Sequence, residues 1–456
     1  MMAVRAAYPH RFRPRRYVIA TFLIGVVVVL VTASSLASAL FSGATLEVFL
    51  FGLPSLALLV AGTAFGLRGL SEPGTIRRRV LLRAAVLLGL GLVLWALVAE
   101  SSLVFHGVSP ATVFGCALAC VPTTGFALWV VRRMDRNEKE PWRVMLAAVI
   151  WGGVVATTLA LWGNELWSLL ITNNIPPGSG ANQSLGLSAG IVEEISKGLA
   201  VLLLYLLVRN EFDGLVDGIV YGAVVGLGFN FMESLIYMST AFVDVQAAGG
   251  PGAAGAALQW GLRQVLGLFF GHATYTAMAG AGIGIARQMP RMHQRLLAIA
   301  SGFLAAIAAH MVWDSWIASA ALPANEGLSL IVVVARELLG NAPFTAAVLL
   351  LLGMGLHAEG NALELHLAAE ADTGRGAVLP PEIRLLRSPW RRLAERIDVL
   401  LQRGPRAWIQ VGRLRSAQLD LAMERWHRAR QEIDEPMEAE EVLRQRVLAC
   451  RAAFAR

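Results

Sequence analysis

The stretch LGLSAGIVEEISKGLAVLLLYLLV, from Leu185 to Val208, decides how the chain folds. It is long enough to cross a bilayer, which takes about 20 apolar residues, but it carries Glu193, Glu194 and Lys197 near its start. A charged side chain at the centre of a bilayer costs at least ~2.5 kcal/mol. Two adjacent carboxylates in a spanning helix must therefore face a polar cavity, a partner or an ion, so this stretch is a candidate functional site.

The composition places the rest of the chain in a membrane as well. Of the 456 residues, 56% are hydrophobic and 16% are charged, a balance too apolar for an ordinary soluble protein. The net charge is +7, and Lys139 and Lys197 are the only lysines among the 39 basic residues. In a chain this apolar, we interpret the arginine excess as a sign of membrane topology rather than of a nucleic-acid surface.

The cysteine residues predict no disulfide framework. There are 3 of them, and Cys116 and Cys120 lie one helical turn apart inside an apolar segment. No histidine lies close enough in the sequence to complete a metal site with them. We expect both to be small core residues.

Ten segments have the length and apolar character of membrane spans. They are residues 17–39, 47–67, 80–105, 111–131, 142–171, 185–208, 215–240, 265–286, 296–320 and 329–356. The first could instead be a signal peptide cleaved at the small residues Ala37 to Ala39. The last is interrupted by Arg336, Glu337 and Pro343, which could divide it into an interfacial helix and a short span.

The basic residues predict the orientation of these spans. Arginine gathers in every second loop, at residues 68–79, 132–143, 209 and 287–295. Because such loops are cytoplasmic, both termini are predicted to be cytoplasmic.

The C-terminal part has a different composition from the spans. After about residue 355 the chain becomes charged, and Trp408, Val411, Leu414, Leu419, Leu421 and Trp426 recur at near-helical spacing. The predicted fold is therefore all-α, a polytopic transmembrane helix bundle of about ten spans with a C-terminal cytosolic helical tail. The predicted divisions are a basic cytosolic N-terminus (1–16), N-terminal transmembrane helices (17–134), a membrane core (135–357) and the tail (358–456).

Polar residues recur on four consecutive predicted spans, beginning with 185–208. They are Glu193, Glu194, Glu233, His272, His310 and Asp314. At 1.5 Å per residue and with alternating helix directions, all six fall in one layer in the outer half of the membrane, within about 5 Å. Burying six polar groups without a purpose is costly, so their convergence predicts a functional site.

The spacing within the helices favours a metal site. His310 and Asp314 are four residues apart and so share a helix face. Together with His272 they would provide three ligands and leave a position open for water, from which a neighbouring glutamate could take a proton. Taken singly, a membrane histidine is more often a hydrogen-bonding residue, and Glu193 with Lys197 can be a simple structural pair.

Four motifs on these helices resemble those of the PrsW family of intramembrane proteases, which is related to the CAAX-protease and bacteriocin-processing superfamily. They are EEISK at 193–197, GFNFMES at 228–234, GHAT at 271–274 and HMVWD at 310–314. The resemblance extends to DRNEKEPW at 135–142 and FDGLVDGIVYG at 212–222, so it covers roughly residues 135–314. Two residues depart from the family pattern, since Ser234 stands where Asn is expected and Leu268 where Phe is.

The resemblance implies roles for the polar residues. Glu193 and Glu194 would include the catalytic acid/base, assisted by His272, with Lys197 in support. The residues that would bind a divalent metal such as zinc, or stabilise the transition state, are Glu233, His272, His310 and Asp314. The wider superfamily has been interpreted both as metalloproteases and as proteases in which Glu and His activate water directly.

Two functions follow as hypotheses. The first is a hydrolase, an intramembrane (metallo)protease in the plasma membrane of a bacterium. It would cleave a membrane protein, such as an anti-sigma factor, near the outer face. Its partners would be that protein or peptide and the lipid bilayer, with no nucleic acid. The second is a non-proteolytic ion or proton carrier, or a scaffold subunit, that uses the same polar layer.

Overall fold

The computed structural model describes residues 53–71, 107–174, 181–208, 212–318, 326–429 and 440–455, with residue 320 and scattered residues before 106. These residues form helices and no strands, as the sequence predicts. The predicted basic segment 1–16 and about half of each of the spans 17–39 and 80–105, including the possible cleavage site, lie outside the described residues.

The described helices follow one another along the chain in this order. Their bounds are α3 Leu53–Ser71, α5 Pro110–Met134, α6 Trp142–Ile150, η2 Trp151–Ala156, α7 Thr157–Asn174, α8 Ala181–Leu207, α9 Leu215–Ala247, α10 Gly252–Trp260, η4 Gly261–Leu266, α11 His272–Gln288, α12 Met292–Val312, η5 Trp313–Ala318, α13 Glu326–Ala335, η6 Arg336–Gly340, α14 Asn341–Ala371, α15 Pro380–Arg387, α16 Pro389–Ala429 and α17 Glu440–Ala455. The elements named η are π-helical turns that continue or join the α-helices.

Within the described ranges, 5 helical segments are long and apolar enough to cross a membrane. They are Pro110–Met134, Trp142–Leu170, Leu215–Ala247, Met292–Ala318 and Gly327–Ala371. Each corresponds to one of the ten predicted spans. The stretch that carries Glu193 is also helical, within α8, and the predicted span 47–67 is described only as the shorter apolar helix Leu53–Gly69.

Two predicted spans were wrong in detail. The span 265–286 is not continuous, because η4 ends before Gly267 and α11 begins only at His272. Gly267 and Gly271 flank this break, and glycine is a poor helix former. His272 therefore opens a helix instead of lying about seven residues inside one. The span 329–356 continues further, since α14 runs to Ala371.

Helix α9 is the centre of the bundle, and 83% of its apolar stretch is buried. It packs against α5, α6, α10 and α11, and on the α11 side the contact is made through glycine. A Cβ added to Gly280 would lie 1.9 Å from the carbonyl oxygen of Gly218, and one added to Gly226 would lie 2.3 Å from that of His272. The two backbones thus touch directly, and this contact sets where α11 begins.

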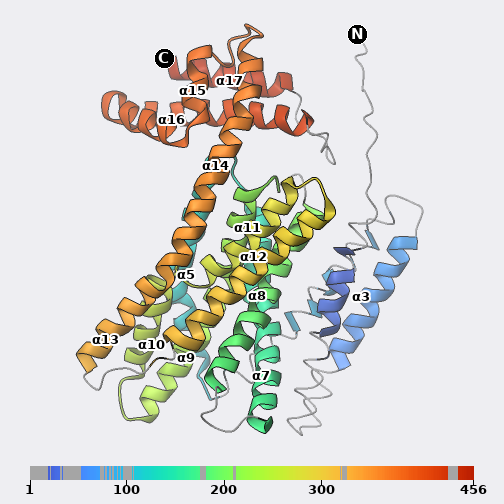
Figure 1. Cartoon of the computed structure of the whole chain (residues 1–456), viewed down its shortest axis with the longest axis vertical. Helices are drawn as coiled ribbons and strands as arrows, with labels where there is room; N and C mark the ends of the chain where they lie inside the picture. Colours follow the sequence, from blue (N-terminus) through green and yellow to red (C-terminus); the bar gives the residue numbers. More distant parts are fainter. Residues whose placement is uncertain are drawn as a thin grey trace.

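The C-terminal segment is a compact group of helices. Figure 1 shows α14 running out of the bundle to α15, α16 and α17, which lie together across one end. The predicted helical pattern is confirmed, since Val411, Leu414, Leu419 and Leu421 are all buried. Helix α16 bends at Gly404, whose φ of 80° is a left-handed conformation that suits glycine.

Ion pairs join these tail helices. Glu382 at the start of α15 lies 2.7 Å from Arg415 on α16 and 2.6 Å from Arg451 on α17. Burial alone would raise the pKa of Glu382, but hydrogen bonds from Arg451 and Arg415 outweigh it and lower the pKa from 4.5 to about 2. The ionised carboxylate therefore stabilises the packing of all three helices.

We predict that Gly280→Ala destabilises the bundle by about 1–3 kcal/mol, because the new methyl group forces α9 and α11 apart. The measurement is the thermal unfolding midpoint of the purified chain in detergent. Gly125→Ala on α5 is the matched control, since its Cβ would meet no atom within 4 Å. Equal midpoints for the two variants would contradict the close glycine contact.

We predict that Glu382→Gln lowers the unfolding midpoint at neutral pH and that this difference disappears in acid. A depressed carboxylate pKa contributes stability above the unfolded value of 4.5, and that contribution is lost as the pH falls toward about 2. The midpoints of wild type and variant, measured from pH 7 to pH 2, check this. Asp372→Asn, at an exposed carboxylate, is the control and should show no such convergence.

Candidate functional site

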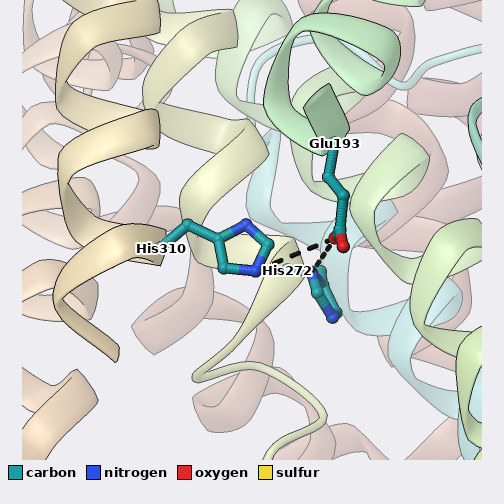
Figure 2. A group of neighbouring side chains, drawn as sticks. All are labelled: Glu193, His272 and His310. Carbon is teal, nitrogen blue, oxygen red and sulfur yellow. Dashed lines mark ion pairs between the residues drawn. The ribbon is translucent and has the colours of Figure 1, made fainter. Parts of the chain in front are cut away.

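Three side chains from three helices meet inside the bundle. Glu193 comes from α8, His272 from the start of α11 and His310 from the end of α12. Figure 2 shows the carboxylate of Glu193 pointing toward both imidazoles. Its Oε2 lies 3.9 Å from Nδ1 of His272 and 3.8 Å from Nε2 of His310, and all three residues are buried.

A second carboxylate holds the far nitrogen of each imidazole. Nε2 of His272 contacts Glu233 of α9, and Nδ1 of His310 lies 2.9 Å from Oε1 of Glu194. A carboxylate on the outer nitrogen orients a ligating histidine and raises its basicity. The glycine contact of α11 with α9 brings His272 to Glu233, which follows Gly226 by two helical turns.

Lys197 compensates the two adjacent glutamates. Its Nζ is fully buried and lies 2.5 Å from Glu194, 3.4 Å from Glu193 and 3.0 Å from Nδ1 of His272. Because an ammonium only donates, Nδ1 of His272 accepts this hydrogen bond, and Nε2 carries the proton that is donated to Glu233. The unprotonated nitrogen of His272 thus faces Glu193.

The two glutamates differ in how fully they are bonded. Glu194 accepts from Lys197 and His310 at one oxygen and from Thr276 at the other, at 3.0 Å. Glu193 has a longer contact with Lys197, a 3.2 Å hydrogen bond from Asn164 and the contacts of 3.8 and 3.9 Å with the two imidazoles. Glu194 is therefore held rigidly, whereas Glu193 keeps acceptor capacity for another group.

The other two predicted residues lie at the margins of this group. Asp314 lies 3.2 Å from Nε2 of His310 and its side chain is 32% exposed, so it stands at the more open edge. Glu233 forms an ion pair with Arg263 as well as its contact with His272. All six predicted polar residues and Lys197 thus lie in one connected network.

Sequence reasoning did not assign some members of this network. Arg263 neutralises Glu233 and its guanidinium lies 4.1 Å from the ring centre of Tyr237. It was visible as a lone arginine in a predicted outer loop that otherwise has none. Asn164 and Thr276 had no such signal, because single polar residues in apolar helices are common and only the packing shows which one faces a carboxylate.

The three central residues have the chemistry of a divalent metal site. One ligand atom from each of Glu193, His272 and His310 lies within 4.8 Å of the others. Two imidazoles and a carboxylate are a ligand set that zinc uses, with a position left for water or substrate. The unprotonated Nδ1 of His272 and the spare acceptor capacity of Glu193 fit such an ion, which would take the place of the Lys197 contact with His272.

A second group of acidic side chains lies beside the tail. Asp135, Glu140 and Asp217 have carboxylate oxygens within 4.8 Å of one another, and Asp213 lies 2.5 Å from His427 of α16. Burial raises the pKa of Asp135 to about 6. These residues belong to DRNEKEPW and FDGLVDGIVYG, so both motifs lie where the tail meets the bundle.

Comparison with known proteins finds one matching protein family. Residues 140–338 match the model of the PrsW family intramembrane metalloproteases. The matched range includes Glu193, His272 and His310, the three residues of the central group. No curated protein and no solved structure matches the chain.

We predict that the purified chain binds about one zinc or other divalent ion, and that His272→Ala and His310→Ala each abolish this binding. Glu193→Gln should weaken binding strongly, whereas Glu233→Gln, which alters the outer contact to His272 and the ion pair with Arg263, should weaken it by about 10–100-fold. Metal content after dialysis measures this. His293→Ala, at an exposed position of α12, is the control. Loss of metal in Asp314→Asn but not in Glu193→Gln would make Asp314 the carboxylate ligand.

Proposed function

We propose that this hydrolase is an endopeptidase that cuts a membrane protein within the bilayer. The match of residues 140–338 to the PrsW family intramembrane metalloproteases supports this. The observation that carries the proposal is the group formed by Glu193, His272 and His310. Each imidazole has one nitrogen directed to Glu193 and the other held by a second carboxylate. Such an arrangement prepares a buried position for water.

Glu193 is the residue that we assign to the reacting water. Its Oε2 faces both imidazoles, and it is less fully bonded than Glu194. As general base it would take the proton as the water attacks the scissile carbonyl carbon, and as general acid it would return the proton to the leaving amine. Glu194 is a positioning residue, since it orients His310 and anchors Lys197.

Zinc is the cofactor that we propose, with His272 and His310 as its nitrogen ligands and with Glu193 beside them as the carboxylate that faces the ion and its water. A divalent ion held there would stabilise, as a Lewis acid, the negative charge that develops on the scissile carbonyl oxygen. Glu233 contacts the opposite nitrogen of His272, which favours an outer role that fixes the tautomer. Asp314 stands at the exposed edge, 3.2 Å from Nε2 of His310.

The orientation that we propose has the tail in the cytosol and the site nearer the outer face. A contact between the tail and a basic loop supports it, since Arg392 of α16 donates to the carbonyl of Arg136. Loops rich in arginine are cytoplasmic. Ten spans in total, with both termini inside a bacterial plasma membrane, complete this topology.

The substrate that we propose is a single-span regulatory protein, such as an anti-sigma factor. The motif resemblance supports this class. A buried site needs its substrate to arrive within the membrane, and a spanning helix would have to unfold locally to present a peptide bond to Glu193, because helical carbonyls are already hydrogen-bonded.

We predict that cleavage depends on Glu193 and His272. Membranes from cells that produce the wild type should contain new protein N-termini that are absent with Glu193→Gln or His272→Ala. The protein so identified, co-reconstituted in liposomes, should be cut about 10²–10⁴-fold more slowly by Glu193→Gln. His293→Ala should cut at the wild-type rate.

Substitutions of the two glutamates should have different effects in the same assay. Glu193→Gln should lose activity and, measured on metal-free protein, keep the wild-type unfolding midpoint. Glu194→Gln should lose both, because it leaves the buried Lys197 without its closest counter-ion.

Cleavage that persists in Glu193→Gln and in His272→Ala would refute the proteolytic function. Ion flux in liposomes that is abolished by Glu233→Gln, without any cleavage, would favour a carrier.

A further inference from the structure

A cavity of about 350 Å³ lies between the loop after α5 and helix α16, away from the proteolytic site. This is within the range of about 300–1,000 Å³ that small ligands occupy. Basic side chains dominate its lining. They are Arg133, Arg136, Lys139, Arg392, Arg396 and Arg415, against the acidic Asp135, Glu138 and Asp420.

Within the described part of the chain, most of these cations form no ion pair with a carboxylate. Among the described residues, no ion pair involves Arg133, Arg136, Lys139 or Arg396, and Nε of Arg396 is buried without any hydrogen-bond partner. Arg392 is buried and donates to Asn137 and to the carbonyls of Arg136 and Leu386. Arg415 is the exception, since it is paired with two glutamates.

The cations are also close enough to repel one another. Burial lowers the pKa of Lys139, and the charges of Arg133 and Arg132 lower it further, against an opposing effect of Asp420. Burial lowers the pKa of Arg392 to about 10, with Asp135 opposing this shift and Arg136 adding to it. An anion in the cavity would relieve both the desolvation and the repulsion.

The chemistry of the cavity favours a phosphate group. Guanidinium groups bind phosphate oxygens with paired hydrogen bonds, and Lys139 adds a point charge. The acidic lining offsets this preference only in part, because three carboxylates face six cations and Asp135 also accepts from the backbone N–H groups of Asn137 and Glu138.

The position of the cavity indicates that the phosphate group belongs to a lipid. Trp129 and Trp142 lie on either side of the loop, are 50% and 51% exposed, and stack under Arg133 and Arg132. Exposed tryptophan next to arginine marks the level of lipid headgroups, and basic pockets at the cytoplasmic face bind anionic headgroups.

We propose that this cavity binds the phosphate-bearing headgroup of an anionic lipid. The bound headgroup bridges the loop 135–141 and α16, so it fastens the tail to the membrane core. The loop in turn holds α9, because Tyr221 donates a hydrogen bond to Glu140. The lipid thereby stabilises the contact between the tail and the helix bundle.

The test is lipid binding by the purified full chain in detergent. Native mass spectrometry and thermal unfolding are measured with phosphatidylglycerol, with phosphatidylcholine and with inorganic phosphate. Phosphatidylglycerol should bind and raise the unfolding midpoint, and phosphatidylcholine should not. Arg136→Gln combined with Arg396→Gln should weaken phosphatidylglycerol binding about tenfold or more.

Two further variants complete the test. Arg406→Gln, at an exposed site on α16, should bind phosphatidylglycerol like the wild type. Lys139→Gln provides a milder change if the double variant fails to fold, and it should also reduce binding. Inorganic phosphate that binds with the same arginine dependence while phosphatidylglycerol does not would overturn the lipid assignment. Equal phosphatidylglycerol binding by wild type, the double variant and Lys139→Gln would overturn the site itself.

Discussion

The direct backbone contact between α9 and α11 is the constraint on which the rest of the structure depends. Packed helices normally stand 8–10 Å apart, a distance set by their side chains. Where Gly218 meets Gly280, and where Gly226 meets the carbonyl of His272, no side chain intervenes. The start of α11 is therefore pressed against α9, and the break before His272 leaves its side chain beside Glu233 instead of in the lipid.

The buried charges can exist together because each of them has a partner. An uncompensated ion inside a low-dielectric core costs several kcal/mol. Lys197 lies against both glutamates of α8, and Arg263 lies against Glu233. His272 has two carboxylate neighbours and His310 has three. The consequence is a network in which Glu194 is locked and Glu193 is not, and this difference separates the positioning residue from the one that meets water.

Much of this arrangement was predictable from residue type and spacing. Charged and imidazole residues in apolar helices, alternating helix direction and a rise of 1.5 Å per residue were enough to bring Glu193, His272 and His310 into one layer. The break at residues 267–271 was not predictable in the same way, because a glycine in an apolar helix is as compatible with close packing as with a helix end. The roles of Asn164 and Arg263 depend on which helices are neighbours in the bundle. The spacing of residues along a single helix does not reveal its neighbours.

The sequence by itself determined that the chain is helical, that it belongs in a membrane, and which polar residues must find partners there, since hydrocarbon tolerates no others. Only the tertiary structure decided which partners they find. Glu193 and Glu194 are neighbours of one type in one helix, and nothing in their order distinguishes them. They differ because side chains about 100° apart on a helix face different neighbours, and those neighbours are supplied by α7, α11 and α12.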